Sequence, residues 1–463
     1  MPARDDDTPR PRLRDAVVAL RQPNFRRFWV GGIISNTGRF FQAIALPAVV
    51  WELTASAGWV GLAGFAQFFP MALVGPVAGA IADRYTRRRV LLFTQSSQAL
   101  VSLGFMALWA GGVRSPTAYV AMSVAAGVTG GLNLPAWQAF VSELVPRELL
   151  LNAVTLNSAQ FNAARMFGPA LAGVTVASLG PAWAFAINAV SFGAVIIALL
   201  RIDTPPAVTD RSTRMRPLRE MADTVRHVRR RPGIVTAIVT VALIGLFGLP
   251  IQSLSVVFAG DVFGVGEGGF GLMVSMIGLG AVASAPVIAS VGARMPRSRL
   301  QGMAMVSYAV AIGVFALAPV FPLALVGLAL LGASHLASAS TLNTTVQLQV
   351  DDDRRAKVLA LYLMVLLLAN PLGQLILGQS MEMVGPRPTV AVAAAVMGAA
   401  VLALRASGRL AALDGEGGRY EPRVAPEVHP SMPVPPRGVP LGGGAARLAG
   451  PGAGDRGSSS AAR

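Results

Sequence analysis

The chain has 463 residues, of which 53% are hydrophobic and only 13% charged, and its mean hydropathy is +0.57. Soluble globular domains carry about 25% charged residues, so this composition excludes a water-soluble globular protein. The formal net charge of +16 does not indicate nucleic-acid binding, because the basic residues lie in short loops and in the tails, as in membrane proteins. Cysteine is absent, which excludes disulfides and thiolate metal sites. Residues 1–27 are polar and Arg-rich and predict no cleavable signal peptide.

Twelve apolar runs are separated by charged and turn residues. A membrane-spanning helix needs about 20 mainly apolar residues, because the hydrocarbon core is about 30 Å thick and a helix rises about 1.5 Å per residue. The predicted spans are residues 28–51, 58–82, 90–112, 117–140, 153–178, 181–201, 233–258, 268–292, 299–319, 321–345, 357–380 and 384–405. Polar residues interrupt the third, fifth and tenth runs. The sequence therefore predicts an all-α membrane protein with twelve transmembrane helices.

Basic residues are concentrated in alternate loops. Arginine follows the second and eighth spans and is frequent in the long segment 202–232. The opposite loops hold mainly acids, at Glu52, Asp261, Glu267 and Glu382, with only Arg114 and Arg387 as bases. By the positive-inside rule, we expect both termini and the 202–232 segment on the cytoplasmic side of the plasma (inner) membrane. An even number of spans fits this orientation.

The same pattern divides the chain into five segments. These are a cytoplasmic N-terminal segment (1–27), a six-helix bundle (28–201), a cytoplasmic linker (202–232), a second six-helix bundle (233–405) and a cytoplasmic tail (406–463). An amphipathic helix is expected in the linker at about 218–230. The tail is rich in Gly, Pro, Ala and Ser, cannot bury a core, and is expected to be disordered.

The two halves of the chain are related by an internal repeat. Residues 168–173 match 373–378 at an offset of 205, and Gly127 matches Gly332 at the same offset. A looser match at an offset of 210 aligns the arginines after the second and eighth spans. Two pseudo-symmetric six-helix bundles joined by a linker are the plan of a transporter, with the substrate site near mid-membrane between the halves and access alternated by rocking.

The loop after the second span carries a glycine pair, an aspartate and a run of arginines. Gly75 and Gly79 form a small-xxx-small face that lets another helix approach closely, and Asp83 lies where a carboxylate can pair with arginine or a helix N-terminus. The pattern resembles the signature loop of the major facilitator superfamily at Gly79, Asp83, Arg84, Arg87 and Arg88. Thr86 stands where glycine is usual. The resemblance implies a cytoplasmic gate in which Asp83 locks against residues 356–358; a plain topology anchor is the alternative for the arginines.

Further stretches resemble the branch that contains macrolide-efflux and enterobactin-exporter-type proteins, among them residues 24–29, 143–150 and 164–173. The last stretch also resembles an antiporter motif of the fifth span, with Ala172 replacing one glycine; the residues concerned are Arg165, Gly168, Pro169 and Gly173. The resemblance covers about residues 20–405 and implies an exporter driven by proton exchange.

Two arginines lie deep in predicted spans. Arg39 is about eleven residues into the first span, roughly 16 Å along the helix, and Arg165 is similarly deep in the fifth. A buried charge costs at least about 2.5 kcal/mol, so both should face the bundle interior or a water-filled cavity. For Arg165, bonds to helix carbonyls or amides are an equal alternative. The residues predicted to line a substrate cavity are Asn36, Arg39, Gln42, Gln138, Asn157, Gln160 and Asn343, although each amide has interhelical bonding as its alternative.

No predicted span carries Asp or Glu in its interior. Proton-coupled carriers often use a buried carboxylate as a proton relay, so coupling is implied here only by the resemblance. His335 in the tenth span and Asp261 at the end of the seventh are the candidate proton carriers, although a lone histidine in a helix is more often structural. Asn370 and Pro371 mark either a break in the eleventh span or a packing kink.

The sequence favours a secondary-active exporter of a drug-like or siderophore-like compound, acting as a monomer in contact with membrane lipids and exchanging the compound for protons. Import of a small solute and a transport-inactive sensor or scaffold remain as alternatives. An enzyme is not indicated, because no His and acid cluster faces one membrane surface and no nucleotide-binding loop is present. We expect no metal, no cofactor and no nucleic-acid partner. The substrate itself cannot be read from the sequence.

Overall fold

The structure, a computed structural model, describes residues 15–202, 217–292 and 294–415. All regular elements in these ranges are helices. The first half contains η1 (Asp15–Arg21), α1 (Pro23–Thr54), α2 (Ala57–Arg84), α3 (Arg87–Ala110), α4 (Pro116–Glu143), η2 (Arg147–Leu149), α5 (Leu150–Leu179) and α6 (Pro181–Leu200). The second contains α7 (Pro217–Arg229), α8 (Pro232–Phe247), α9 (Ile251–Val257), η3 (Phe258–Val262), α10 (Gly266–Gly292), α11 (Arg297–Leu317), α12 (Phe321–Gln349), α13 (Asp352–Val384), α14 (Pro386–Ala406) and η4 (Ala411–Asp414).

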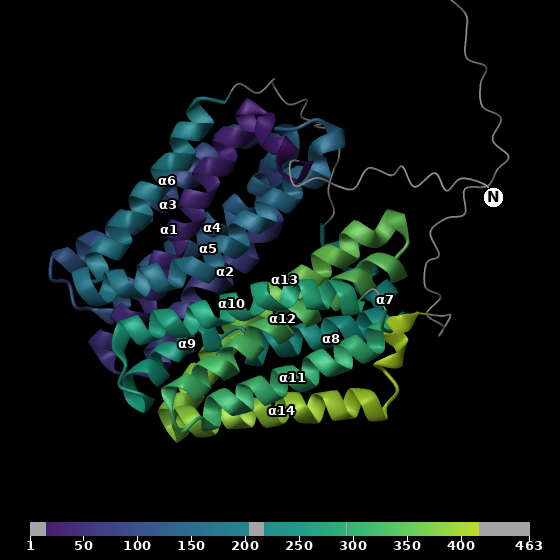
Figure 1. Cartoon of the computed structure of the whole chain (residues 1–463). Helices are drawn as coiled ribbons and strands as arrows, with labels where there is room; N and C mark the ends of the chain where they lie inside the picture. Colours follow the sequence, from purple (N-terminus) through teal and green to yellow (C-terminus); the bar gives the residue numbers. More distant parts are fainter. Residues whose placement is uncertain (1–14, 203–216, 293, 416–463) are drawn as a thin grey trace, which may run out of the picture. The chain divides into compact units, whose positions relative to one another are not determined.

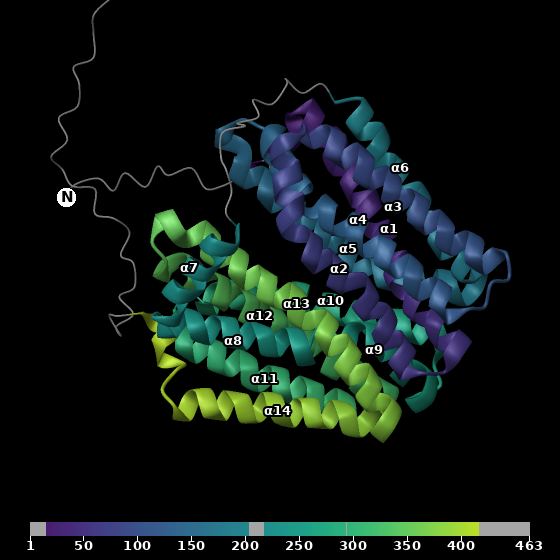
Figure 2. The same ribbon diagram turned by 180° about the vertical axis from the view of Figure 1, so that it is seen from behind.

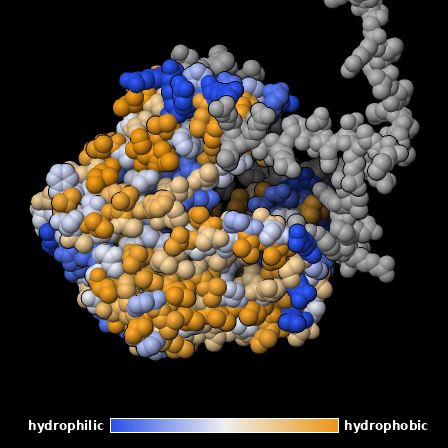
Figure 3. All heavy atoms as spheres, viewed as in Figure 1, coloured by the Kyte–Doolittle hydropathy of each residue, from blue (hydrophilic) through white to orange (hydrophobic). Residues whose placement is uncertain are grey.

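The twelve predicted spans correspond to α1–α6, to α8 continued by α9 and η3, and to α10–α14. Within the described ranges, ten of these segments are long and apolar enough to cross a membrane by length and composition; α4 and α5 are not among them. Both carry amide side chains that line an internal cavity, and this lowers their hydropathy. Hydrophobic residues cover the flanks of the helices, and hydrophilic residues gather at the helix ends (Figure 3).

The internal repeat predicted from the sequence is also present in two turns between helices. Gly180 ends α5 with φ 86°, and Gly385 ends α13 with φ 89°. A positive φ is accessible to glycine without a Cβ penalty. Each glycine is followed by a proline that starts the next helix, Pro181 and Pro386, where the missing N–H breaks no helical bond. The two turns lie 205 residues apart.

The seventh span is interrupted, which the sequence analysis did not anticipate. α8 ends at Phe247, and a new helix begins at Ile251 after Gly248, Leu249 and Pro250. Proline cannot donate the helical hydrogen bond. The break expected at Pro371 is absent, because α13 runs without interruption through that residue; the alternative of a packing kink is the one compatible with this helix.

The helices form two groups, α1–α6 and α8–α14, which Figures 1 and 2 show from opposite sides. In the first, α1 packs on α5 and α6, α2 on α4, and α3 on α4 and α6; in the second, α10 and α11 pack on α12, and α13 on α8. Gly127 of α4 lies against the backbone of α2 at Gln67, and Gly332 of α12 lies against α10 at Ile277. The two glycines matched in sequence therefore have the same packing role.

The two bundles contact each other through α2 on α13 and α5 on α10. Glycines meet in both contacts: Gly61 with Gly378, and Gly173 with Gly271. Gly173 and Gly378 are 205 residues apart, and Gly61 and Gly271 are 210 apart, so the contacts are related by the internal repeat. Each contact lies in the half of its helices nearest the α1–α2 turn.

A carboxylate joins the bundles at that end. Glu382 near the end of α13 accepts hydrogen bonds from Ser56 Oγ (2.9 Å) and from the backbone N–H of Gly58 (3.2 Å). Gly58 belongs to the first turn of α2, where unpaired N–H groups favour an anion. This contact is called the Glu382 latch below.

The linker and the tail are described in part. The amphipathic helix predicted at about 218–230 is confirmed as α7. Residues 1–14, 203–216 and 416–463 of the predicted terminal segment, linker and tail lie outside the described residues. The start of the predicted tail is folded, because η4 packs on α8 and α11, Leu413 is fully buried and Asp414 accepts the N–H of Ser298 at 3.0 Å.

Candidate functional site

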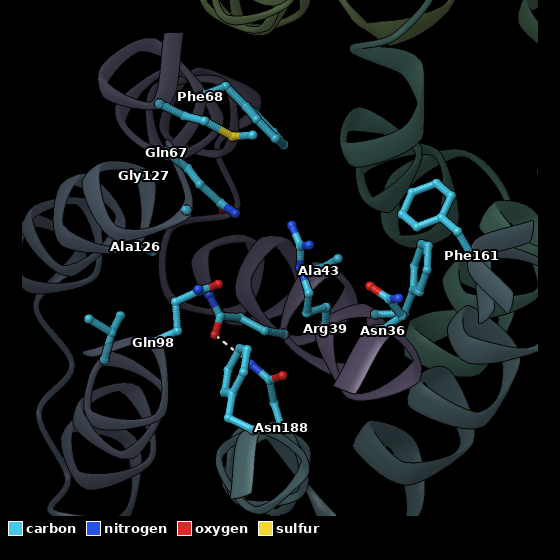
Figure 4. Close-up of a pocket in the computed structure, with 16 residues that line it drawn as sticks. Asn36, Arg39, Ala43, Gln67, Phe68, Gln98, Ala126, Gly127, Phe161 and Asn188 are labelled. Atoms are coloured by element: carbon cyan, nitrogen blue, oxygen red, sulfur yellow. Dashed lines mark hydrogen bonds between the residues drawn. The ribbon is translucent and has the colours of Figure 1, made fainter. Parts of the chain in front are cut away.

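Two adjoining cavities lie inside the first bundle, with volumes of about 220 and 360 Å³. They share five lining residues and therefore form one connected space: Asn36, Arg39, Met71, Gly130 and Phe161. The first cavity extends toward α3 and α6, and the second extends between α4 and α5. Arg39 lines both, so this predicted residue lies at the junction; Figure 4 shows it among the residues of the first cavity.

The Arg39 side chain is exposed to the cavity. Figure 4 shows its guanidinium directed into the open space between α1 and α2. No carboxylate, carbonyl or amide in the described part of the chain forms a hydrogen bond or an ion pair with it. Guanidinium is a donor of five N–H groups and never an acceptor. The cavity therefore offers an unsatisfied cation at its centre, which suits a carboxylate, phenolate or other anionic group.

Amide side chains surround Arg39. Of the predicted cavity residues, Asn36, Gln42, Gln138 and Asn157 line the space. Gln42 Oε1 accepts a hydrogen bond from Asn188 Nδ2 at 2.9 Å, drawn as the dashed line in Figure 4. These amides supply both donors and acceptors for a polar ligand.

Two of the predicted cavity residues do not line this space. Gln160 is 1% exposed and donates to Asn157 Oδ1 at 2.8 Å, so it supports a lining residue from behind. Asn343 is exposed on α12 and accepts a hydrogen bond from Gln347, and it lines neither cavity.

Several lining amides were not predicted: Gln67, Gln95, Gln98, Asn133 and Asn188. Asn133 is 7% exposed, and its Oδ1 accepts hydrogen bonds from Thr94 Oγ1 (2.9 Å) and Gln95 Nε2 (3.0 Å). The one sign in the sequence that could have indicated these residues is an amide within an apolar helix. The spacing of residues along α3 and α6 does not show which face of each helix lines the cavity and which packs on another helix. Four aromatic side chains form apolar parts of the cavity wall: Phe40, Phe68, Phe161 and Trp137.

Arg165 lies apart from this cavity, at the contact between the bundles. Its backbone carbonyl abuts Gly278 of α10, and its charge acts on two residues of the other bundle, Tyr308 and His335. The Tyr308 and His335 rings meet edge to face with centroids 6.3 Å apart. His335 Nδ1 is buried without a hydrogen-bond partner in the described residues. Arg165 and His335, predicted to act separately, therefore lie within electrostatic range of each other.

The glycines of the predicted span-five motif act in packing. A Cβ at Gly168 would lie 2.8 Å from Phe40 Cβ on α1, and one at Gly173 would lie 2.8 Å from Gly271 Cα on α10. Pro169 is buried within α5, and its carbonyl faces Gly271. The motif therefore sets how closely α5 approaches α1 and α10.

The arginines after α2 bind within the first bundle. Arg87 forms an ion pair with Glu143 at the end of α4. Arg88 donates to the carbonyls of Leu199 (2.6 Å) and Leu200 (3.1 Å) at the end of α6, where a cation is favourable. Arg84 is exposed, and a Cβ at Gly75 would meet nothing within 4 Å. The side chains at positions 79, 83 and 356 lie outside the described residues, so the predicted Asp83 gate has no described geometry.

Asp261 lies in η3 and is exposed at the end of the molecule that carries the Glu382 latch. The Glu382 charge acts on it. Both residues belong to the second bundle.

The chain matches the family described as transmembrane secretion effector over residues 15–429. It is 25% identical to the enterobactin exporter of Citrobacter koseri over 373 residues, which cover 79% of this chain and 86% of that protein. It is 26% identical to the staphyloferrin A transporter of Staphylococcus aureus, over 57% of this chain and 66% of that protein.

Solved transporter structures share the fold. The nucleoside transporter NupG superposes with a TM-score of 0.69 at 13% identity, covering 83% of this chain and 98% of that one. A bacterial homologue of the lysosomal transporter Spinster, captured inward-facing and unoccupied, gives 0.67 at 15% identity, covering 87% and 99%.

Proposed function

Because the chain belongs to the major facilitator superfamily, in the family of transmembrane secretion effectors, we propose that this transporter exports a small organic anion, of siderophore-like or drug-like kind, from the cytoplasm. The relatives named above are an enterobactin exporter and a staphyloferrin A transporter. The observation that carries the proposal is the unpaired Arg39 guanidinium in the cavity of the first bundle.

The proposed substrate contacts follow from the cavity. Arg39 binds the anionic group, Asn36, Gln42 and Gln138 bond to polar atoms, and Phe68 and Phe161 pack on an apolar body. A charge-assisted hydrogen bond to Arg39 contributes about 1.5–3 kcal/mol.

Transport proceeds by alternating access in this proposal. The bundles meet near the α1–α2 turn, which this proposal puts outside the cell by the positive-inside rule, and the state closed on the outside is the one we assign to this arrangement. The bundles at 28–201 and 233–405 move against each other, with both termini and the linker in the cytoplasm. The Asp83 loop closes the cytoplasmic side in the opposite state.

Proton exchange supplies the energy in this scheme. A proton on His335 would place a second positive charge near Arg165 at the bundle interface, and this repulsion would favour separating the two bundles where α5 meets α10. Asp261 is the alternative carrier, at the outer end. A substitution of His335 by Gln that abolishes uptake driven by a pH gradient, while substrate counterflow persists, would support the first assignment.

The direct test is flux in proteoliposomes loaded with candidate anions, with and without an imposed pH gradient. Arg39→Gln is expected to lower anion transport about 10- to 150-fold, as the loss of 1.5–3 kcal/mol implies, and Arg39→Lys should recover part of it. Arg405→Gln removes an exposed arginine at the end of α14 and serves as the charge-matched control. Full anion flux in Arg39→Gln would contradict the substrate site.

Substrate flux in the same direction as the proton flow, into vesicles with an alkaline interior, would favour a proton-coupled importer, whereas exchange drives substrate into acidified vesicles. No gradient-dependent flux for any member of a broad panel would favour a transport-inactive sensor.

A further inference from the structure

A second cavity of about 480 Å³ lies outside the transport path, between the linker helix α7 and the start of α13. Its lining is mostly basic: Arg226, His227, Arg230, Arg354 and Lys357, with Asp223 as the one acid among its lining residues. Across residues 217–231 and 351–358 together, Arg and Lys also outnumber Asp and Glu. The proposed transport of organic anions uses none of these residues.

The α7 helix is fixed on the second bundle by its apolar face. Val228 is 5% and Thr224 8% exposed, and α7 packs on α8 and α13. The Arg226 and Arg230 side chains are exposed one helical turn apart and therefore lie on one side of α7. At the end of the helix, Arg231 pairs with Asp351 at 3.3 Å and so ties the linker to the turn before α13.

A histidine in this cavity has an unused donor. Arg354 Nη1 lies 2.9 Å from His227 Nδ1, and because guanidinium only donates, Nδ1 must be the acceptor. The neutral ring then carries its proton on Nε2. His227 Nε2 is buried and finds no hydrogen-bond partner in the described residues. An unmatched buried donor is costly, and an anionic oxygen in the cavity would satisfy it.

The cavity lies beside the starts of two membrane spans. Its residues on α7 directly precede the membrane span that starts at Pro232, and its residues on α13 surround the start of the span at Lys357. Arginine pairs bind phosphate oxygens in a two-pronged geometry, and basic pockets at the ends of spans suit anionic headgroups.

We propose that the α7–α13 cavity binds a phosphate-bearing anion, supplied by an anionic phospholipid headgroup. The phosphate is held by Arg226 and Arg230, accepts a hydrogen bond from His227 Nε2, and ties the linker helix to the second bundle.

The test uses the full-length protein in detergent micelles, with thermal unfolding followed during titration. Three additives are compared: dioctanoyl phosphatidylglycerol, dioctanoyl phosphatidylcholine, and potassium phosphate against potassium chloride at equal ionic strength. Phosphatidylglycerol is expected to give a saturable rise in melting temperature that phosphatidylcholine does not. If potassium phosphate alone gives the same saturable rise, the site stands and its source is a soluble phosphate.

Variants locate the site. The Arg226→Gln/Arg230→Gln pair should weaken the apparent affinity for phosphatidylglycerol at least about tenfold, since two charge-assisted bonds are lost. Arg229→Gln removes one arginine of the same helix at a residue outside the cavity lining and should stay within about twofold, whereas Arg226→Gln and Arg230→Gln made singly should each weaken binding further than that. His227→Ala removes a donor without removing a formal charge and should weaken binding about threefold to tenfold. An equal loss in Arg229→Gln, no change in the two cavity variants, or no saturable rise with any additive would overturn the proposal.

Discussion

The Glu382 latch holds the bundles together at one end only, so its removal should shift the balance between transport states. Glu382 makes two hydrogen bonds across the bundle interface, to Ser56 Oγ at 2.9 Å and to the N–H of Gly58 at 3.2 Å. Both are charge-assisted, and the groups are partly open to solvent, so each contributes about 0.5–1 kcal/mol. Glu382→Ala should therefore favour the outward-open state by about 1–2 kcal/mol, about a five- to thirtyfold change in its population.

The chain contains no cysteine, which makes thiol labelling a clean assay. Ala43 lines the cavity, and Ala43→Cys reports access to it from outside when an impermeant thiol reagent is added to intact cells. The labelling rate should rise about five- to thirtyfold in Glu382→Ala. Glu52→Ala removes an acid at the same end of the molecule, with no described hydrogen bond, and should leave the rate unchanged. An unchanged rate in Glu382→Ala, or an equal rise in Glu52→Ala, would refute the reasoning.

Two further predictions concern stability, measured as the melting temperature of the purified protein by tryptophan fluorescence. Gly127→Val would push a side chain into the α2 backbone and should destabilise by about 1–3 kcal/mol; Gly193→Ala, where a Cβ meets nothing within 4 Å, is the control and should be neutral. Asn133→Leu removes the acceptor shared by Thr94 and Gln95. Thr94 keeps the Leu91 carbonyl as acceptor, but the buried Gln95 amide loses its partner, which should cost about 1–3 kcal/mol. A loss of unfolding free energy of this size should lower the melting temperature by more than about 1 °C. If Gly127→Val or Asn133→Leu melts within about 1 °C of wild type, the expectation for that variant is wrong.

Apolar runs bounded by charged and turn residues were sufficient to predict where the twelve spans lie, because each span must satisfy its own backbone hydrogen bonds inside the bilayer. They did not predict the interruption of the seventh span between Phe247 and Ile251. The repeat offset of 205 went further, since it paired Gly127 with Gly332, and both proved to abut a neighbouring backbone. Arg39 was predicted at the cavity because an arginine at mid-membrane must find a polar environment.

The rest of the site depends on tertiary packing. Gln98 on α3 and Asn188 on α6 line the cavity, but their helices also bury amides against other helices, and sequence spacing does not separate these faces. Gln160 shows the reverse case, because it is one turn from Asn157 yet lies behind it. Arg165 and His335 lie near each other because α5 of the first bundle packs on α10 of the second. No local sequence pattern predicts this contact between the bundles.

The glycine pairs between the bundles have a consequence for how closely the two bundles fit together. At Gly61 with Gly378 and at Gly173 with Gly271, backbone meets backbone with no side chain between them. Such surfaces can separate and meet again without any rotamer change. A Cβ added at any one of these positions would lie within 2.8 Å of a facing backbone atom and would force the helices apart, so the fit between the bundles depends on four residues that have no side chain.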